Sequence, residues 1–178
     1  MGGNVLLKYL GEQGQHTIIK KAVGVSVTID LKSTALHLEK GFNKLYLHRF
    51  LVLLKRKIRL KQLDYPDAID YSNVYKAKNF RTLDEYWTAP IHGYKGALDY
   101  WQKCSSKQFL ADIRIPTMVI NALNDPFITE ESYPVKECKQ NDKLMLDAPK
   151  HGGHVGFPKM SDGMNYYESK IIEFFVEK

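Results

Sequence analysis

The stretch Thr117-Met-Val-Ile-Asn121-Ala-Leu-Asn-Asp125-Pro-Phe127 consists of a short apolar run with an acid close behind it. A second apolar run, Lys143-Leu-Met-Leu-Asp147, leads in the same way into a polar loop, the glycine-rich His151-Gly-Gly-His154-Val-Gly-Phe157. Both runs are typical of strands in a parallel sheet, where catalytic groups gather beyond the carboxyl ends of the strands. The pattern therefore predicts that Asp125 and His154 form a pair in which the acid holds the imidazole in one tautomer.

Length and composition indicate one globular domain. The chain has 178 residues, of which 44% are hydrophobic and 26% charged, so it is long enough to bury a core. Its apolar runs fall far short of the roughly 20 residues that span a bilayer, and the N-terminus shows no export signal. Two cysteines are too few for a disulfide framework and lack metal-ligand spacing. We expect a cytoplasmic protein without a bound metal or cofactor.

Apolar periodicity predicts strands that alternate with helices. A nearly continuous β-branched run at 22–29 fits a strand buried on both faces, and two further strands are expected at 117–122 and 143–146. Helices are expected at 5–10 (stopped by Gly11), 31–39, 45–60, from Thr82 to before Pro90, 94–103 and 165–176. The fold class is therefore α/β, with about three parallel strands and flanking helices.

The site residues also have simpler interpretations. Asp125 precedes a proline, which is typical of an Asx turn, and a loop histidine such as His154 often bonds only to the backbone. Their joint position behind consecutive strands favours a catalytic relay. Metal binding by His151 and His154 is a weaker hypothesis, because no third ligand stands at a recognisable spacing. His92 in a turn is more typical of a structural residue.

Several motifs together give the chain a family resemblance. They are the segment 2–11, Thr88-Ala-Pro90, Tyr94, Ile115-Pro116, Asn124-Asp-Pro-Phe127 and the loop 151–157. The chain resembles the C-terminal part of the YheT-like, embryogenesis-associated branch of the α/β-hydrolase superfamily. The resemblance implies a partial α/β-hydrolase domain over 1–178, with a helical cap-like insertion at about 44–104. It further implies a Ser-His-Asp carboxylic-ester hydrolase of ester or acylglycerol-like small molecules, with Asp125 as acid and His154 as general base.

The sequence departs from this family at the nucleophile. The family's elbow reads Gly-x-Ser-x-Gly-Gly-Asn, whereas this chain begins Met1-Gly-Gly-Asn4, so the matching serine would stand immediately before Met1. The backbone N–H of Met1 would be one oxyanion-hole donor. None of the other candidate serines, Ser26 in a predicted strand, Ser33, Ser105 and Ser106, occupies a strained strand-to-helix turn. We expect the chain alone to be inactive.

The incomplete sheet also predicts a partner. Its first strand would have an exposed apolar edge, which is a template for pairing with another chain. We expect association there with the N-terminal half of the hydrolase domain or with a second copy. The sequence leaves the substrate-binding residues unknown.

A basic helix offers an alternative function. Lys55, Arg56, Lys57, Arg59 and Lys61 place five cations within seven residues of a chain with net charge +6. The alternative is a non-catalytic interaction module that uses helix 45–61 on a membrane surface or acidic partner. A solvated helix end, favoured by the helix dipole, is the simpler interpretation. We expect no nucleic-acid partner.

Overall fold

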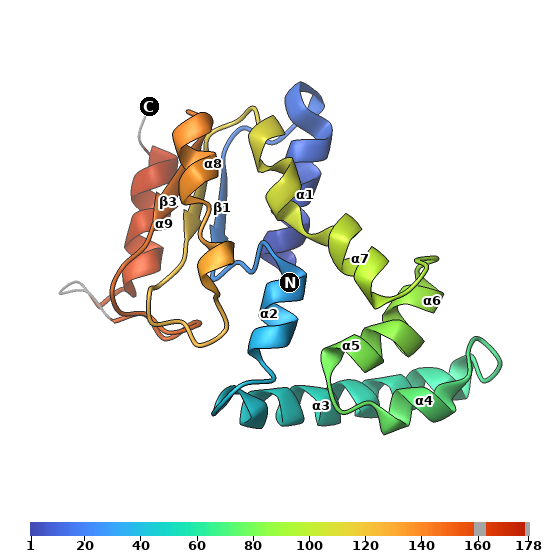
Figure 1. Ribbon diagram of the computed structural model, residues 1–178. Helices are drawn as coiled ribbons and strands as arrows, with labels where there is room; N and C mark the ends of the chain where they lie inside the picture. The colour runs from blue at the N-terminus through green and yellow to red at the C-terminus, as the bar shows by residue number, and fades with distance from the viewer. Residues whose placement is uncertain (159–162, 177–178) are drawn as a thin grey trace. The chain divides into compact units, whose positions relative to one another are not determined.

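The computed structural model describes residues 1–158 and 163–176, which divide into two compact units (Figure 1). Unit 1 consists of Met1–Asp30 and Ser105–Lys178 and contains the sheet, whereas unit 2 is Leu31–Cys104. The elements of unit 1 are α1 (Gly2–Gln13), η1 (Gly14–His16), β1 (Ala22–Val25), η3 (Ser106–Asp112), β2 (Thr117–Ile120), η4 (Glu130–Ser132), α8 (Val135–Gln140), β3 (Leu144–Asp147) and α9 (Tyr166–Val176). Those of unit 2 are α2 (Leu31–His37), α3 (Asn43–Asp64), α4 (Tyr71–Lys76), α5 (Phe80–Leu83), the π-helix η2 (Asp84–Thr88), α6 (Ala89–Ile91) and α7 (Ala97–Cys104).

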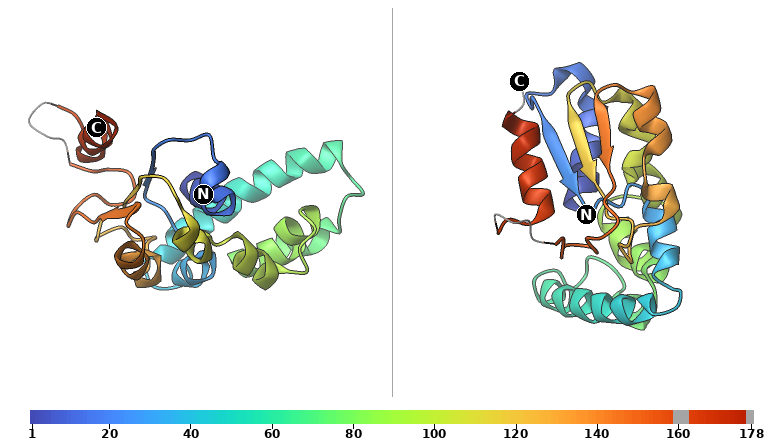
Figure 2. Two further views of the ribbon diagram at one scale, coloured as in Figure 1. Left: turned by 90° about the horizontal axis from the view of Figure 1, so that it is seen from above. Right: turned by 90° about the vertical axis from the view of Figure 1, so that its left-hand side faces the viewer.

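The sheet of unit 1 is parallel, in the order β1-β2-β3. In its register Thr117 of β2 stands between Ala22 of β1 and Leu144 of β3. Helices α1 and α8 cover one face and α9 covers the other (Figure 2). The predicted α/β class, with three parallel strands and flanking helices, is confirmed.

Alternation along each strand builds a core on both faces. Val119 joins Leu7 and Leu10 of α1 in one cluster, whereas Ile120 packs with Phe157 on the α9 side. Successive strand residues point to opposite faces, so a strand covered on both sides must be apolar throughout. Apart from Thr117 at the start of β2 and Asp147 at the end of β3, the three strands therefore contain no polar side chain.

The first strand is shorter than the sequence predicts, because β1 ends at Val25 and not at Ile29. Ser26 has φ +52°, and no other non-glycine residue of the described ranges has a positive φ. This left-handed conformation turns the chain out of the sheet. Val27 stays buried beyond the turn, where the side-chain amide of Asn121 binds its N–H at 2.7 Å and its carbonyl at 3.0 Å. The prediction failed because a buried loop here has the same apolar composition as a strand.

Helix α1 also differs from the prediction, since it does not stop at Gly11 but continues to Gln13. A Cβ atom at Gly11 would lie 2.2 Å from the carbonyl oxygen of Phe109 in η3. The glycine therefore allows close packing of α1 on η3 and is not a helix terminator. The helix ends at Gly14, which has φ +52° and donates its N–H to the carbonyl of Leu10.

The predicted helix start at Thr82 and end before Pro90 are both wrong. Helix α5 begins earlier because the side chain of Asn79 accepts the N–H of Thr82 at 2.8 Å. Glu85 does not close a capping box but accepts the N–H of Ala97, at 2.8 Å. The helical path continues through η2 into α6, where Pro90 lies in the first turn and needs no N–H partner.

A buried acid lies at the centre of unit 2. Both oxygens of Asp84 accept hydrogen bonds, one from Trp101 Nε1 at 2.8 Å and one from Thr88 Oγ1 at 2.6 Å. Burial raises the pKa of Asp84, and the two hydrogen bonds act in the opposite direction. The protonated form of this carboxyl is therefore favoured by folding.

This raised pKa predicts a pH-dependent stability. The contribution of Asp84 is fully present below the ordinary aspartate pKa, near 4, and is lost as pH rises through its raised pKa. Urea unfolding followed by tryptophan fluorescence should show the wild type losing stability, relative to Asp84→Asn, as pH increases. Asp99→Asn is the control, because Lys103 lowers the pKa of Asp99 and the difference should have the opposite slope. Parallel curves for wild type and Asp84→Asn would contradict the prediction.

Candidate active site

The carboxyl ends of β2 and β3 bring two polar loops together. Hydrogen bonding between the two chain segments continues past the strands, from Asn121 N to the Asp147 carbonyl at 3.0 Å and from Leu123 N to the Pro149 carbonyl at 2.8 Å. The loops that follow therefore leave the sheet side by side. This shared exit is what places residues that are 29 positions apart at one site.

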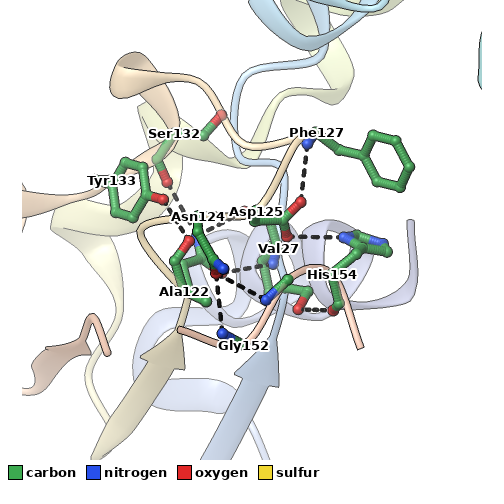
Figure 3. Close-up of polar contacts among 12 residues, drawn as sticks. Val27, Ala122, Asn124, Asp125, Phe127, Ser132, Tyr133, Gly152 and His154 are labelled. Carbon is green, nitrogen blue, oxygen red and sulfur yellow. Dashed lines mark hydrogen bonds and ion pairs between the residues drawn. The ribbon is translucent and has the colours of Figure 1, made fainter. Parts of the chain in front are cut away.

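Asp125 and His154 face each other across these loops (Figure 3). The distance from Asp125 Oδ2 to His154 Nδ1 is 2.9 Å. The Asp125 side chain is 0% exposed, whereas that of His154 is 37% exposed. A carboxylate at Nδ1 fixes the proton of the neutral ring on that nitrogen and leaves Nε2 as an acceptor. Within the described ranges, Nε2 has no hydrogen-bond partner.

The Asx turn at Asp125 and its contact with His154 occur together, because the two carboxylate oxygens have separate partners. Oδ1 accepts the backbone N–H of Phe127 at 2.8 Å, which closes the Asx turn across Pro126. Oδ2 remains for His154. The turn also brings the Phe127 ring edge-on to the imidazole, with centroids 4.7 Å apart. The turn thus holds the acid still and restricts the ring.

Asn124 organises the glycine-rich loop. Its Oδ1 accepts the N–H groups of Gly152 and Gly153, both at 2.9 Å. Gly153 has φ +54°, and a Cβ atom at Gly152 would lie 2.7 Å from Cβ of Ala122. Both glycines are therefore needed for the loop to approach the end of β2. Sequence reasoning quoted Asn124 within a motif but assigned it no role.

Ser26 is a site residue that the sequence did not reveal. Its hydroxyl donates to the backbone carbonyl of His154, whereas the sequence predicts it to be a residue inside a buried strand. The bond goes to the main chain and not to the imidazole, so this geometry makes Ser26 a support for the loop. A positive φ at a serine has no sequence signal comparable to that of a glycine.

Tyr133 lies near Asp125 and is bonded to the segment that follows β2. Its hydroxyl donates to the Ala122 carbonyl at 2.7 Å. Burial raises the pKa of Tyr133, and the negative charge of Asp125 raises it further. The phenol therefore stays protonated and keeps this donor beside the buried carboxylate.

The remaining histidine candidates do not assemble into a site. His151 is exposed, and His92 is exposed at the end of α6 in unit 2. His154 is paired with Asp125 through Nδ1. Residues 1–158 and 163–176 contain no group of three or more His, Cys, Asp or Glu side chains placed to hold a metal.

The basic cluster of unit 2 divides into two sets. Lys55 Nζ donates to the carbonyls of Tyr75 and Ala77, at 2.8 and 2.6 Å, and burial lowers the pKa of Lys55. Arg59 lies over the Tyr75 ring, and Lys61 lies over an aromatic ring as well. Lys55 and Arg59 therefore connect α3 to residues 75–77, whereas the ring under Lys61 is that of Tyr65 at the end of α3 itself. Lys55 is partly buried, and the other four cations are exposed.

Comparisons with known proteins find relatives that are named as an esterase, a phospholipase and a lipase. It is 35% identical to the Escherichia coli protein named Putative esterase YheT over 159 residues, which are 88% of this chain and 46% of that protein. It is 30% identical to human Phospholipase ABHD3 over 183 residues, covering 99% of this chain and 45% of the relative. It is 27% identical to Monoacylglycerol lipase of Saccharomyces cerevisiae, covering 98% and 40%. No family model and no solved structure matches the chain.

The chain belongs to the α/β-hydrolase superfamily. The resemblance to its YheT-like branch is thereby confirmed, and the parallel sheet with flanking helices agrees with part of that fold. The chain spans slightly less than half the length of the curated relatives that it matches.

The orientation of the imidazole by Asp125 can be tested directly. At a pH where the imidazole is neutral, we expect nitrogen-detected NMR to show His154 mainly with its proton on Nδ1. In Asp125→Ala this tautomer should become the minor form, because the carboxylate that favours it is gone. His92 is the matched control, because it has no carboxylate partner in the described structure. An unchanged His154 tautomer in Asp125→Ala would show that the acid does not orient the ring.

The supporting role of Ser26 predicts an unusual pair of variants. Ser26→Ala loses the hydrogen bond to the His154 carbonyl and should lower the free energy of unfolding by about 1 kcal/mol. Ser26→Gly loses the same bond but relieves the positive φ, which costs a non-glycine residue about 1 kcal/mol. Urea denaturation should therefore rank Ser26→Gly above Ser26→Ala. The reverse order would refute the conformational argument.

Proposed function

We propose that Asp125 and His154 are the acid and general base of a serine-type carboxylic-ester hydrolase. The observation that carries the proposal is a buried carboxylate bonded to a half-exposed imidazole whose Nε2 is free to take a proton. Relatives named as an esterase, a phospholipase and a monoacylglycerol lipase support the same chemistry. The substrate class is an ester or an acylglycerol-like small molecule.

In this mechanism each group has one task. His154 Nε2 takes the proton of a serine hydroxyl as that oxygen attacks the ester carbonyl, and later gives a proton to the leaving alcohol. Asp125 stabilises the imidazolium that forms in between. The Asx turn at Phe127 and the Asn124 contacts keep both groups in place, so little reorganisation accompanies the transfer.

The nucleophile in this proposal comes from polypeptide outside these 178 residues, because the described structure places no hydroxyl at His154 Nε2. The first turn of α1 is the candidate oxyanion site, since helix N-termini carry free N–H groups and positive potential. Gly3 in that turn lies against Val27 just past β1, where a Cβ atom would be 2.5 Å from Val27 Cγ2. The N–H of Met1 is retained as one proposed donor.

The edge of β1 is the proposed attachment surface. Among the described residues β1 pairs with β2 alone, so its other edge keeps unpaired backbone groups. We propose that a strand of the serine-bearing N-terminal half adds there, with a second copy of this chain as the competing occupant. Unit 2 is proposed as the cap, beginning at Leu31 rather than at about residue 44. A cytoplasmic location remains part of the proposal.

The proposal predicts activity by complementation. The chain alone should not hydrolyse p-nitrophenyl esters, and the same should hold for the part of the Escherichia coli relative that it does not match. The two parts together should hydrolyse them. In the complex, Asp125→Asn should lower kcat by ~10⁴-fold and His154→Ala by at least ~10³-fold.

His151→Ala is the matched control for the complementation assay, because this neighbouring loop histidine is exposed and lies outside the relay. Light scattering of each mixture separates failure of assembly from failure of chemistry. Full activity of His154→Ala in an assembled complex would overturn the relay. Hydrolysis by the chain alone would overturn the external nucleophile.

A further inference from the structure

Helix α3 carries the entire charge imbalance of the chain. Its 22 residues include seven of the chain's 26 lysines and arginines and only one of its 20 acids, Asp64. The rest of the chain is therefore neutral, with 19 residues of each sign. Among the described residues, no ion pair joins a cation of α3 to a carboxylate. The positive charge of this helix is thus not neutralised within the part of the chain that the structure describes.

The outward side of the same helix is apolar. Leu47, Leu51 and Ile58 lie on one side of the helix and are buried. The opposite side, which we call the α3 outer face, carries exposed side chains at helical spacing: Leu45, Arg49, Val52, Leu53, Arg56, Leu60 and Leu63, preceded by Phe42. Helix α3 (Figure 1) is about 33 Å long, and the α3 outer face has residues from Leu45, near its first turn, to Leu63, near its last.

The apolar side chains of this face are strongly exposed to solvent. Phe42 is 87% exposed, Leu63 77% and Leu45 69%. Single exposed apolar residues are ordinary, but a continuous apolar stripe with arginines inside it marks an interaction surface. A nucleic acid would be met by polar and aromatic groups between the cations, and here aliphatic side chains occupy those positions. The combination of leucine and arginine on one face fits the boundary between lipid headgroups and acyl chains.

We propose that the α3 outer face docks in the plane of an anionic phospholipid bilayer. Leu45, Leu60 and Leu63 enter the acyl boundary, and Arg49 and Arg56 bind lipid phosphates from the same stripe. Lys55 attaches the helix to its unit through two backbone carbonyls, so the face is presented on a fixed support. Among the described residues, no helix is long and apolar enough to cross a membrane. The proposal does not depend on ester hydrolysis.

Vesicle sedimentation with the 178-residue chain tests this proposal. The chain should sediment with vesicles of phosphatidylcholine containing about 30% phosphatidylserine and much less with phosphatidylcholine alone. Raising salt from about 50 to about 500 mM should weaken the binding but not abolish it, because only the charge contribution is screened. Leu60→Trp should show a blue-shifted emission on the anionic vesicles, relative to the wild-type background, if the side chain enters the acyl boundary.

Two sets of variants separate the parts of the surface. Arg49→Glu with Arg56→Glu should weaken binding to anionic vesicles at least ~10-fold, since each surface arginine contributes roughly fivefold. Lys136→Glu with Lys139→Glu on α8 is the control with the same change in net charge, and it should bind nearly as the wild type does. Leu60→Ala with Leu63→Ala should remove the binding that survives high salt. All six substituted side chains are exposed, so thermal melting should be unchanged.

Three outcomes would overturn the proposal. The first is the absence of sedimentation with anionic vesicles. The second is equal weakening by the α3 and α8 charge reversals, which would reduce the effect to overall charge. The third is a stable dimer in light scattering that the leucine variants convert to monomer, because the α3 outer face would then contact a second copy of the chain.

Discussion

The bond between Asp125 and His154 depends on a carboxylate that is fully withdrawn from water. An ionised side chain at 0% exposure is costly unless every oxygen has a donor, and here the imidazole serves one oxygen and the N–H of Phe127 the other. Removing either donor would leave a buried charge half-satisfied. The pair is therefore stable only while the two loops stay in register, and that register comes from β2 and β3. The hydrogen bonds continuing beyond both strands transmit the order of the sheet directly to the site.

The residues of the pair were predictable from the sequence because each follows an apolar run, and parallel strands end at one edge of a sheet. The residues that support the pair were not. Ser26 acts through a backbone carbonyl and a left-handed φ, and neither property follows from serine in an apolar run. The role of Asn124 was likewise hidden, because its partners are two main-chain N–H groups 28 and 29 residues away.

The errors in element boundaries share a physical cause, which is tertiary contact overriding a local signal. Gly11 is a typical helix terminator, yet here the missing Cβ makes room for the Phe109 carbonyl. Glu85 stands where a capping box would use it, yet its carboxylate serves the start of α7. In both cases a partner distant in sequence decides the role of the residue. The prediction from apolar periodicity holds for the longest helix, since the helix expected at 45–60 lies inside α3.

Because all the excess positive charge lies in one helix, that helix determines the orientation in which the protein approaches an anionic bilayer. A uniformly basic surface attracts an anionic bilayer in many orientations, whereas a neutral body with one basic helix is attracted in essentially one. The apolar residues of the α3 outer face then add burial of hydrocarbon to this oriented attraction, and salt does not screen that contribution. Lys55, the first cation of the cluster, supports this arrangement because it donates hydrogen bonds to the carbonyls of Tyr75 and Ala77, while Arg49 and Arg56 remain exposed.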